Sequence, residues 1–303
     1  MRLYVIPILK DRWAYYCHST LPTTSRLTKI VDWSSQKWEN LDKAEPDSWK
    51  KKLYVKGTNV MNQLDYQEWF LKSIPAKEEL QQPLNEVLVH HPSLLDPSLI
   101  HQHLEALLQY RIPYHRKYMW YSAYWVPIAC TFVLVPLIPN IPLAYNLFRL
   151  YSHYKALKGA EHLQHLMSST PTAVDSSSGE KERENEAKSS IHRSIFKYTQ
   201  DMELDTLFNG ARLSLKLNVA KNIAFPKELE QAYQPSSEKK RNAVPSHQQL
   251  ASSLAQDIDG VLNQQHIKYL VDQLDVPGLE TELSRARFQI LKNIATERFA
   301  NNK

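Results

Sequence analysis

Three pairs of histidines are the first residues of this sequence whose type and spacing suggest chemistry. They are His90-His91, His101/His103 and His162/His165. The last pair would share one face of a helix, three residues apart. However, no His-Glu-x-x-His or Glu-x-x-His pattern surrounds it, and a metal site needs three or four converging ligands. We therefore interpret these histidines as solvated side chains, and we predict neither a metal ion nor a cofactor.

No other pattern of catalytic or phosphate-binding residues is present. Residues 257–260 (DIDG) are too short for a calcium loop and lack its closing glutamate. The two cysteines, Cys17 and Cys130, have no recognisable partner motif, and they are too few for a disulfide framework. The chain contains only 6 glycines and no glycine-rich phosphate loop. We therefore expect no enzymatic activity and assign no catalytic residue.

Composition restricts the class of protein further. The chain has 303 residues and a formal net charge of +5, and its mean hydropathy is −0.48. A transporter of this length with many membrane spans would be apolar almost throughout, so this class is excluded. Residues 1–31 contain five basic residues and a single acid, Asp11. This acid-poor start is compatible with import into mitochondria.

The periodicity of the chain predicts four regions. Residues 1–110 begin with two runs of strand formers, RLYVIPIL and RWAYYCH, which predict a short β-hairpin in which Pro7 suits an edge strand. Helical spacing follows up to Ile74, then a proline-punctuated connector and a helix that starts at Asp96-Pro97. Residues 111–167 form the second region, and residues 168–190 are a polar linker that we expect to be disordered. Residues 191–303 are again helical in pattern, with Pro277-Gly278 separating the last two helices.

The second region holds the longest apolar run of the chain. No charged residue and no histidine occurs between Met119 and Phe148. The prolines that interrupt this run, and an asparagine suited to cap a second helix, predict two helical arms joined by a tip at Pro136, Pro139, Asn140 and Pro142. A spanning helix needs ~20 apolar residues, so both a full span and a re-entrant hairpin remain open.

Basic and aromatic residues flank this run on both sides. Arg116, Lys117, Trp120, Trp125, Arg149 and Tyr151 have the composition of anchors at a membrane interface. The alternative is a buried pair of helices in a water-soluble core. We favour the membrane and predict a mainly α, membrane-anchored protein with a proline-broken transmembrane or re-entrant helical hairpin and a short N-terminal β-hairpin. The lipid bilayer is thus the first expected partner.

Several stretches resemble one family. They are MRLYVIP…YYC, WKKKLYVKGTNVMNQLDYQEWFLKSIP and the long segment RIPYHRKYMWYSAYWVPIACTFVLVPLIPNIPLAYNLFRLYSHYKALKGAEHL. Together they resemble the mitochondrial potassium–proton exchange-related proteins of fungi over residues 1–167. The resemblance implies a protein of the mitochondrial inner membrane that is needed for exchange of matrix potassium for protons, and so for control of matrix volume. Potassium ions and protons are expected ligands through this resemblance alone.

The residues themselves identify no ion pathway. An exchanger needs a protonatable group at membrane depth, and residues 119–148 have no acid, base or histidine. We therefore interpret the chain as a component or regulator of potassium–proton exchange that associates with other membrane subunits or with itself. The alternative is a membrane-tethered scaffold that binds mitochondrial RNA, ribosomes or another membrane complex. No nucleic-acid-binding module is visible, although aromatic residues between Trp33 and Trp69 leave RNA stacking open.

Overall fold

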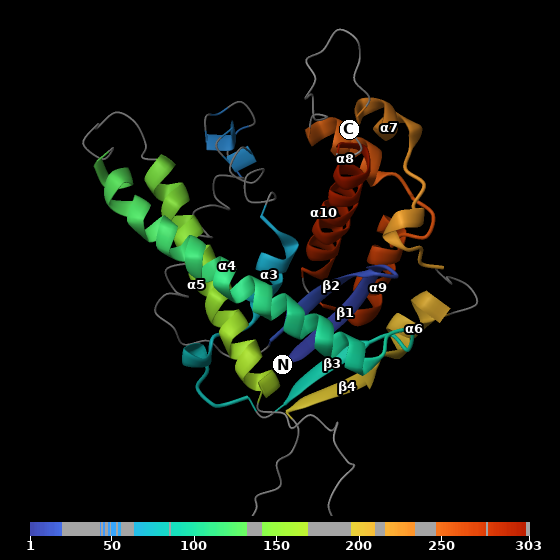
Figure 1. Cartoon of the computed structure of the whole chain (residues 1–303), viewed down its shortest axis with the longest axis horizontal. Coiled ribbons are helices and arrows are strands. Elements are labelled where there is room, and N and C mark those ends of the chain that lie inside the picture. Colours follow the sequence, from blue (N-terminus) through green and yellow to red (C-terminus); the bar gives the residue numbers. More distant parts are fainter. Residues whose placement is uncertain are drawn as a thin grey trace, which may run out of the picture.

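A computed structural model shows a four-stranded sheet with helices on both faces (Figure 1). The structure describes residues 1–19, 64–84, 86–131, 141–168, 195–209, 216–233, 247–276 and 278–300, and some positions between 43 and 55. The predicted linker, apart from Ser168, lies outside these ranges, as do Trp33, Trp38 and Trp49 among the aromatic residues noted between Trp33 and Trp69.

The predicted N-terminal β-hairpin is confirmed. Strand β1 (Arg2–Leu9) pairs antiparallel with β2 (Arg12–His18), with Lys10-Asp11 at the turn. Nearly every residue of β1 is buried, because side chains on both faces of the sheet are covered. Pro7 does not lie on an edge strand. Its missing N–H is tolerated because the pairing of β1 with the neighbouring β3 extends only over Arg2–Tyr4.

Two further strands, which the sequence pattern did not predict, complete the sheet. Strand β3 (Val87–His91) lies parallel to β1 within the expected proline-punctuated connector, and β4 (Phe196–Gln200) lies parallel to β3. The strand order is therefore β2-β1-β3-β4. Helix α3 (Tyr66–Ser73) and the 3₁₀ helix η1 (Lys77–Glu79) connect β1β2 to β3, and the long helices α4 (Pro97–Thr131) and α5 (Ile141–Ser168) connect β3 to β4.

The remaining helices follow β4. They are α6 (Met202–Asn209), η3 (Ala220–Asn222), α7 (Lys227–Tyr233), α8 (His247–Ala255), α9 (Gln264–Leu274) and α10 (Leu279–Ala300). The predicted break at Pro277-Gly278 is confirmed, since it lies between α9 and α10. Because β4 belongs to the same sheet as β1, the regions 1–110 and 191–303 build one structure.

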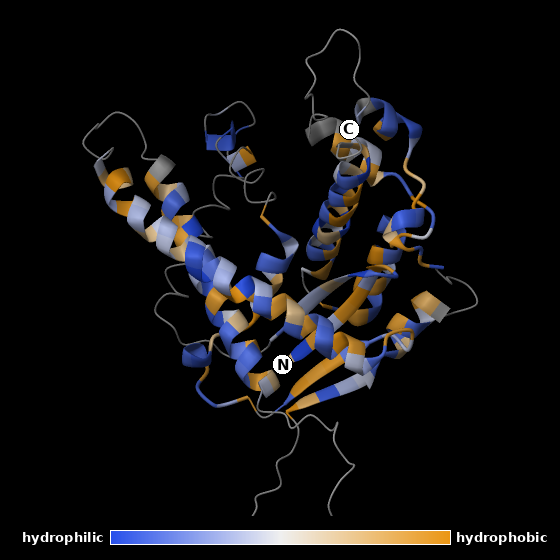
Figure 2. Ribbon diagram, in the orientation of Figure 1, coloured by the Kyte–Doolittle hydropathy of each residue, from blue (hydrophilic) through white to orange (hydrophobic). Residues whose placement is uncertain are grey.

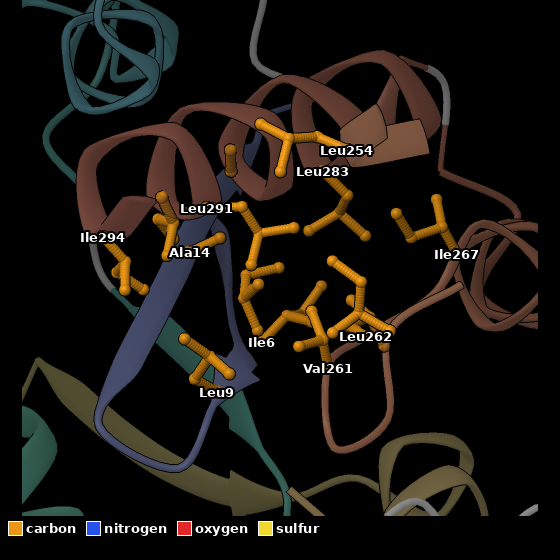
Figure 3. Packing of buried hydrophobic residues seen from close by; sticks show 14 of the residues in the cluster. Ile6, Leu9, Ala14, Leu254, Val261, Leu262, Ile267, Leu283, Leu291 and Ile294 are labelled. Carbon is orange, nitrogen blue, oxygen red and sulfur yellow. The ribbon is translucent and has the colours of Figure 1, made fainter. Parts of the chain in front are cut away.

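Each face of the sheet supports its own hydrophobic core. Leu3 and Val5 of β1 pack with α3, α4 and α5, whereas Ile6 and Ile8 pack with helices α6 to α10. This alternation follows from the two-residue period of a strand, and β1 and β3 are accordingly among the most hydrophobic elements in Figure 2. Figure 3 shows the second core, in which Leu283 and Leu291 of α10 meet Ile6. The sheet is thus the middle layer of three.

Helices α4 and α5 form the predicted hairpin, but the prediction that it contains a membrane-spanning helix is wrong. In the part of the chain that the structure describes, no helix combines the length and the apolar character that crossing a membrane requires. The physical reason is that the apolar run is divided between two helices. Its first part forms the end of the 35-residue helix α4, and its last part forms the start of α5. The rest of α4 carries charged residues, among them Arg111, Arg116 and Lys117. Neither helix thus supplies ~20 consecutive apolar residues.

Candidate functional site

A buried group of polar side chains lies where α3 crosses the α4–α5 hairpin. Glu68 of α3 is 3% exposed, and its Oε1 accepts hydrogen bonds from Arg149 (2.9 Å) and from the Ser152 hydroxyl (2.6 Å). Arg149 and Ser152 both belong to α5. Burying a carboxylate is costly unless it is paired and hydrogen-bonded, and this one is both. We call Glu68, His115, Arg149, Ser152 and His153 the helix-junction cluster.

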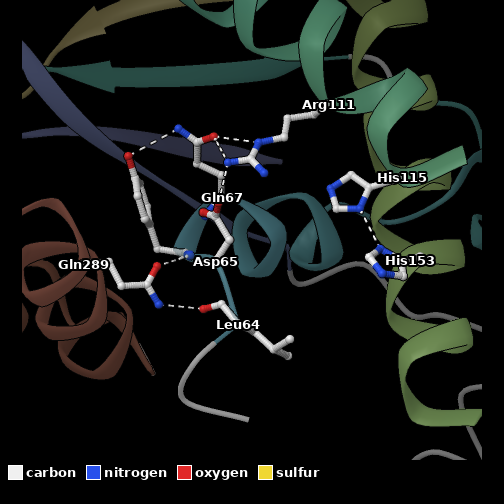
Figure 4. A network of polar contacts seen from close by, with 8 residues as sticks. Leu64, Asp65, Gln67, Arg111, His115, His153 and Gln289 are labelled. Carbon is white, nitrogen blue, oxygen red and sulfur yellow. Dashed lines mark hydrogen bonds and ion pairs between the residues drawn. The ribbon is translucent and has the colours of Figure 1, made fainter. Parts of the chain in front are cut away.

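Two histidines join the hairpin helices inside this cluster. His115 of α4 and His153 of α5 are buried, and their Nδ1 atoms lie 3.1 Å apart (Figure 4). An Arg149 N–H lies 2.8 Å from Nε2 of His153. Arginine can only donate, so Nε2 of a neutral His153 accepts and its proton is on Nδ1. The Nδ1–H of His153 then donates to Nδ1 of His115. His115 therefore carries its own proton on Nε2.

This arrangement of protons leaves one buried group unsatisfied. Nε2 of His115 is buried and has no hydrogen-bond partner among the described residues. The opposite arrangement would place two donors, Nε2–H of His153 and the Arg149 guanidinium, against each other. Because a buried unsatisfied polar group costs about 1–3 kcal/mol, the cluster is more costly to maintain than an apolar contact of the same size.

Burial and charge fix the protonation states of the cluster. Desolvation lowers the pKa of His115 to about 4 and that of His153 to about 4, and the Arg149 charge adds to the effect on His153. Desolvation acts to raise the pKa of Glu68, but the Ser152 hydrogen bond and the Arg149 charge outweigh it, so this pKa lies below its ordinary value. At neutral pH the cluster thus holds a carboxylate, a guanidinium and two neutral imidazoles.

Hydrogen bonds from α4 and α10 hold α3 in place. Asp65 caps α3 by accepting from the Gln67 backbone N–H (2.9 Å), and Arg111 of α4 donates to the side chains of both residues. Gln289 of α10 accepts from the backbone N–H of Tyr66 (2.9 Å) and donates to the Leu64 carbonyl (2.7 Å). Figure 4 shows these contacts on the two sides of α3. The position of Glu68 is therefore fixed through the start of its helix.

The histidine pairs singled out from the sequence lie elsewhere. His91 and His162 are buried, so interpreting them as solvated was wrong. Nδ1 of His162 bonds the Pro75 carbonyl oxygen (2.7 Å), and Nδ1 of His90 lies 2.9 Å from Asp201. Nδ1 of His101 lies 2.9 Å from the Tyr198 hydroxyl and Nδ1 of His103 lies 2.6 Å from that of Tyr15. The first of these contacts ties α5 to the loop after α3, and the other three tie helices or their flanking residues to the sheet. Glu68, His115 and His153 are the only group of three metal-ligating side chains close together in the described part of the chain.

The expected interfacial anchors separate into two groups. Arg149 points into the helix-junction cluster, and Tyr151 is half-buried. Arg116, Lys117, Trp120 and Trp125 are exposed on α4. Of the expected tip, Pro142 is the second residue of α5, while Pro136, Pro139 and Asn140 lie outside the described residues.

The exposed anchors belong to a projecting part of the hairpin. We call residues 116–131 of α4 and 141–151 of α5 the distal arm, and Figure 1 shows its far end beyond the rest of the molecule. Among residues 116–131 and 143–151, only Ala129 is buried. Asn146 links the two helices by donating to the Ser122 carbonyl (2.9 Å). Trp120, Tyr124 and Trp125 are 56%, 71% and 59% exposed. So large an aromatic surface on a folded protein indicates an interaction site.

Sequence reasoning missed the helix-junction cluster because its members are far apart in the chain. One usable signal was present. His115 continues the buried face of Ile100, Leu104 and Leu108 at helical spacing, and His153 precedes Ala156 and Ala160 in the same way. A histidine on an apolar helical face is buried when that face is buried. The sequence does not show that the His115 face of α4 packs against the His153 face of α5, or that Glu68 lies close to both histidines.

Comparison with known proteins identifies the family. The family model described as "Mitochondrial K+-H+ exchange-related" matches residues 2–167. An uncharacterized protein of Saccharomyces cerevisiae is 26% identical over 204 residues, covering 56% of this chain and 63% of the yeast protein. This chain therefore spans less than two thirds of that relative's length. An uncharacterized protein of Schizosaccharomyces pombe is 28% identical over 173 residues, covering 55% of this chain and 76% of that protein. No solved structure matches.

The family match includes β1 to β3, α3 and nearly all of the α4–α5 hairpin, and so both the helix-junction cluster and the distal arm. It extends over more than half of the chain. The name of the family relates it to potassium–proton exchange in mitochondria. The resemblance seen in the sequence is thereby confirmed, and the chain belongs to the mitochondrial K+-H+ exchange-related family.

Proposed function

We propose that the protein is an accessory subunit of potassium–proton exchange at the mitochondrial inner membrane, and that it docks on another protein of that system through the distal arm. Family membership supports the connection to exchange. The observation that carries the proposal is the arm itself, which presents Trp120, Tyr124 and Trp125 to solvent. Regulation of exchange would in turn control matrix cation content and volume. The proposal includes no enzymatic step.

The arm has the composition of a protein interface, and its charge favours a protein partner over a lipid surface. Tryptophan and tyrosine are the residues that contribute most to binding energy at protein interfaces, and acidic residues are depleted there. The sequence has no acid between residues 106 and 160. An anionic lipid surface would need free positive charge.

Most positive charge of the hairpin is already compensated. Arg116 pairs with Glu161 (2.9 Å), Lys155 with Glu79, and Lys158 with Glu78 (3.1 Å). Lys117 has no acid within ion-pair distance among the described residues and lies 5.7 Å from the centre of the Tyr121 ring. One free lysine gives little attraction to anionic headgroups, since each contributes only about 1 kcal/mol. The aromatic surface is therefore the main determinant of binding.

Mitochondrial swelling tests the role in exchange. In potassium acetate, acetic acid enters the matrix as the neutral molecule and releases a proton there. An exchanger replaces this proton with potassium from outside. Water follows the accumulated potassium acetate, and the matrix swells. We expect mitochondria from cells lacking the gene to swell more slowly than those of the parent strain, and the potassium–proton ionophore nigericin to restore the rate. Equal swelling with and without the gene would refute the role in exchange.

Paired arm variants test the docking surface. We expect Trp120→Ala/Trp125→Ala to lose most of the swelling rate and to release the protein from a complex isolated in mild detergent. Tyr110→Ala is the matched control, because Tyr110 is a 66% exposed aromatic on the same helix outside the arm. If the double variant binds its partners and supports swelling as the control does, the arm is not the docking surface. Flotation with lipid vesicles in place of protein capture would identify the lipid as partner and would equally contradict the proposal.

A further inference from the structure

We propose that Glu68, His115 and His153 form a binding site for a single zinc ion. The three side chains come from three different helices, α3, α4 and α5, and are 3%, 0% and 2% exposed. Each offers one ligand atom, and these atoms all lie within 4.8 Å of one another. Two imidazoles and a carboxylate are a ligand set that zinc uses in proteins, with a fourth position left for water or another group. This site does not depend on the docking role proposed for the arm.

The distance between the two imidazoles fits one shared ion. Two nitrogens that bind the same zinc ion at ~2.0–2.1 Å in tetrahedral geometry lie about 3.3 Å apart. The two Nδ1 atoms of His115 and His153 are 3.1 Å apart. The carboxylate of Glu68 is ionised and the imidazoles are neutral, which are the states that metal binding requires.

The hydrogen bonds of the cluster already prepare two of the three ligands. In the metal-free arrangement derived above, the proton of His115 is on Nε2, so its Nδ1 lone pair is available without a change of tautomer. Arg149 and Ser152 both donate to Oε1 of Glu68 and so orient the carboxylate. Such hydrogen bonds to a ligating carboxylate are a regular feature of metal sites.

The third ligand, His153, shows what limits the affinity of the site for zinc. Binding through Nδ1 of His153 moves its proton to Nε2, which then faces the donor Arg149 at 2.8 Å. The guanidinium must turn this N–H away, and its positive charge also repels the ion. Arg149 therefore acts as a competitor for the site. A glutamine at this position would remove both the positive charge and the guanidinium donor that faces Nε2 of His153.

Zinc titration of the full chain, freed of metal by a chelator that is then removed, tests the site. We expect one zinc ion per chain, measured by competition with a fluorescent chelator, together with a rise in melting temperature, because the ion joins three helices. Cobalt as a spectroscopic substitute should give the visible absorption of a tetrahedral site. His115→Gln and His153→Gln should each weaken binding at least 100-fold. His165→Gln, an exposed histidine on the same helix α5, should bind as the wild type does.

Arg149→Gln separates ligation from a mere effect on folding. We expect it to bind zinc about tenfold more tightly than wild type, although it loses a buried ion pair and is less stable without metal. Unchanged or weaker binding by Arg149→Gln would overturn the assignment. So would the absence of a one-to-one complex in the wild type, or zinc binding that survives in both His115→Gln and His153→Gln, which would indicate adventitious binding by surface histidines.

Discussion

Removing Arg149 should expose the energetic cost of the buried carboxylate beneath it. In Arg149→Met, Glu68 keeps its hydrogen bond from Ser152 (2.6 Å) but loses its only ion-pair partner among the described residues. Leaving a buried charge without its partner costs about 3–5 kcal/mol. This is a large share of the ~5–15 kcal/mol by which native proteins are stable, so we expect a marked fall in the urea midpoint, measured with a chelator present.

Burial can be isolated as the cause, because the hairpin contains a matched ion pair at its surface. Arg116–Glu161 has the same chemistry and the same 2.9 Å distance, but its side chains are 57% and 34% exposed, against 17% and 3% for Arg149–Glu68. Arg116→Met should cost less than about 0.5 kcal/mol. In Glu68→Gln/Arg149→Met the buried charge is absent, and we expect at least half of the loss to be recovered.

The pH dependence supplies an independent check. In the wild type the pKa of Glu68 is lowered, so its contribution to stability is present above the unfolded-state pKa and is lost as pH falls through the folded-state pKa. Without Arg149 one of the causes that lower this pKa is lost, and we expect desolvation to raise the pKa above its unfolded value. The loss in Arg149→Met should therefore be larger at pH 7.5 than at pH 5. A loss below about 1 kcal/mol, or one that is independent of pH, would refute the description of this pair.

Three further outcomes follow from packing and burial. Gly159→Ala should destabilise the fold by about 1–3 kcal/mol in urea unfolding, because a Cβ there would collide with the Leu71 carbonyl oxygen of α3; an unchanged midpoint would show that the two helices do not approach so closely. Arg287→Met should cost at least about 2 kcal/mol, because the buried guanidinium donates to the carbonyls of Leu262, Leu254 and Gln256; a neutral effect in the same assay would contradict these bonds. Native protein at pH 8 should take up one maleimide, at exposed Cys130, and two in urea, because desolvation raises the pKa of buried Cys17 to about 12; labelling of native Cys130→Ser would show that Cys17 is accessible.

Local signals predicted those parts of the fold that depend on neighbouring residues. The β-hairpin was found because two runs of strand formers flank a short polar turn, and the core face of α10 follows from Leu279, Leu283, Ala286, Ile290 and Ile294 at helical spacing, all of which are buried. Strands β3 and β4 were missed. Each has only five residues, and each pairs with strands distant in the chain, so no adjacent sequence marks it as part of a sheet.

The wrong prediction of a membrane-spanning helix has a related cause. The two arms were predicted correctly, but the length of the charge-free run was taken to favour a span, although only part of that run lies in each helix. The helix-junction cluster was missed because the helical patterns of α3, α4 and α5 each show which face is apolar, but not which faces pack against one another. What the sequence did indicate was the unusual surface of the distal arm, through Trp120 and Trp125. Exposed aromatic residues with basic neighbours have a similar composition at a membrane and at a protein interface.

The parallel pairing of β4 with β3 also determines when this chain is able to fold. Leu88 pairs with Lys197, which is 109 residues further along, and β4 is the strand that completes the sheet. Closing so long a loop before its contacts form is entropically costly, and folding slows as the sequence separation of contacts rises. A chain that enters a mitochondrion N-terminus first would have more than 190 residues across before β4 arrives. Until then β1 and β3 expose an unpaired edge and two apolar faces, which makes the incomplete protein prone to aggregation and a natural substrate for chaperones.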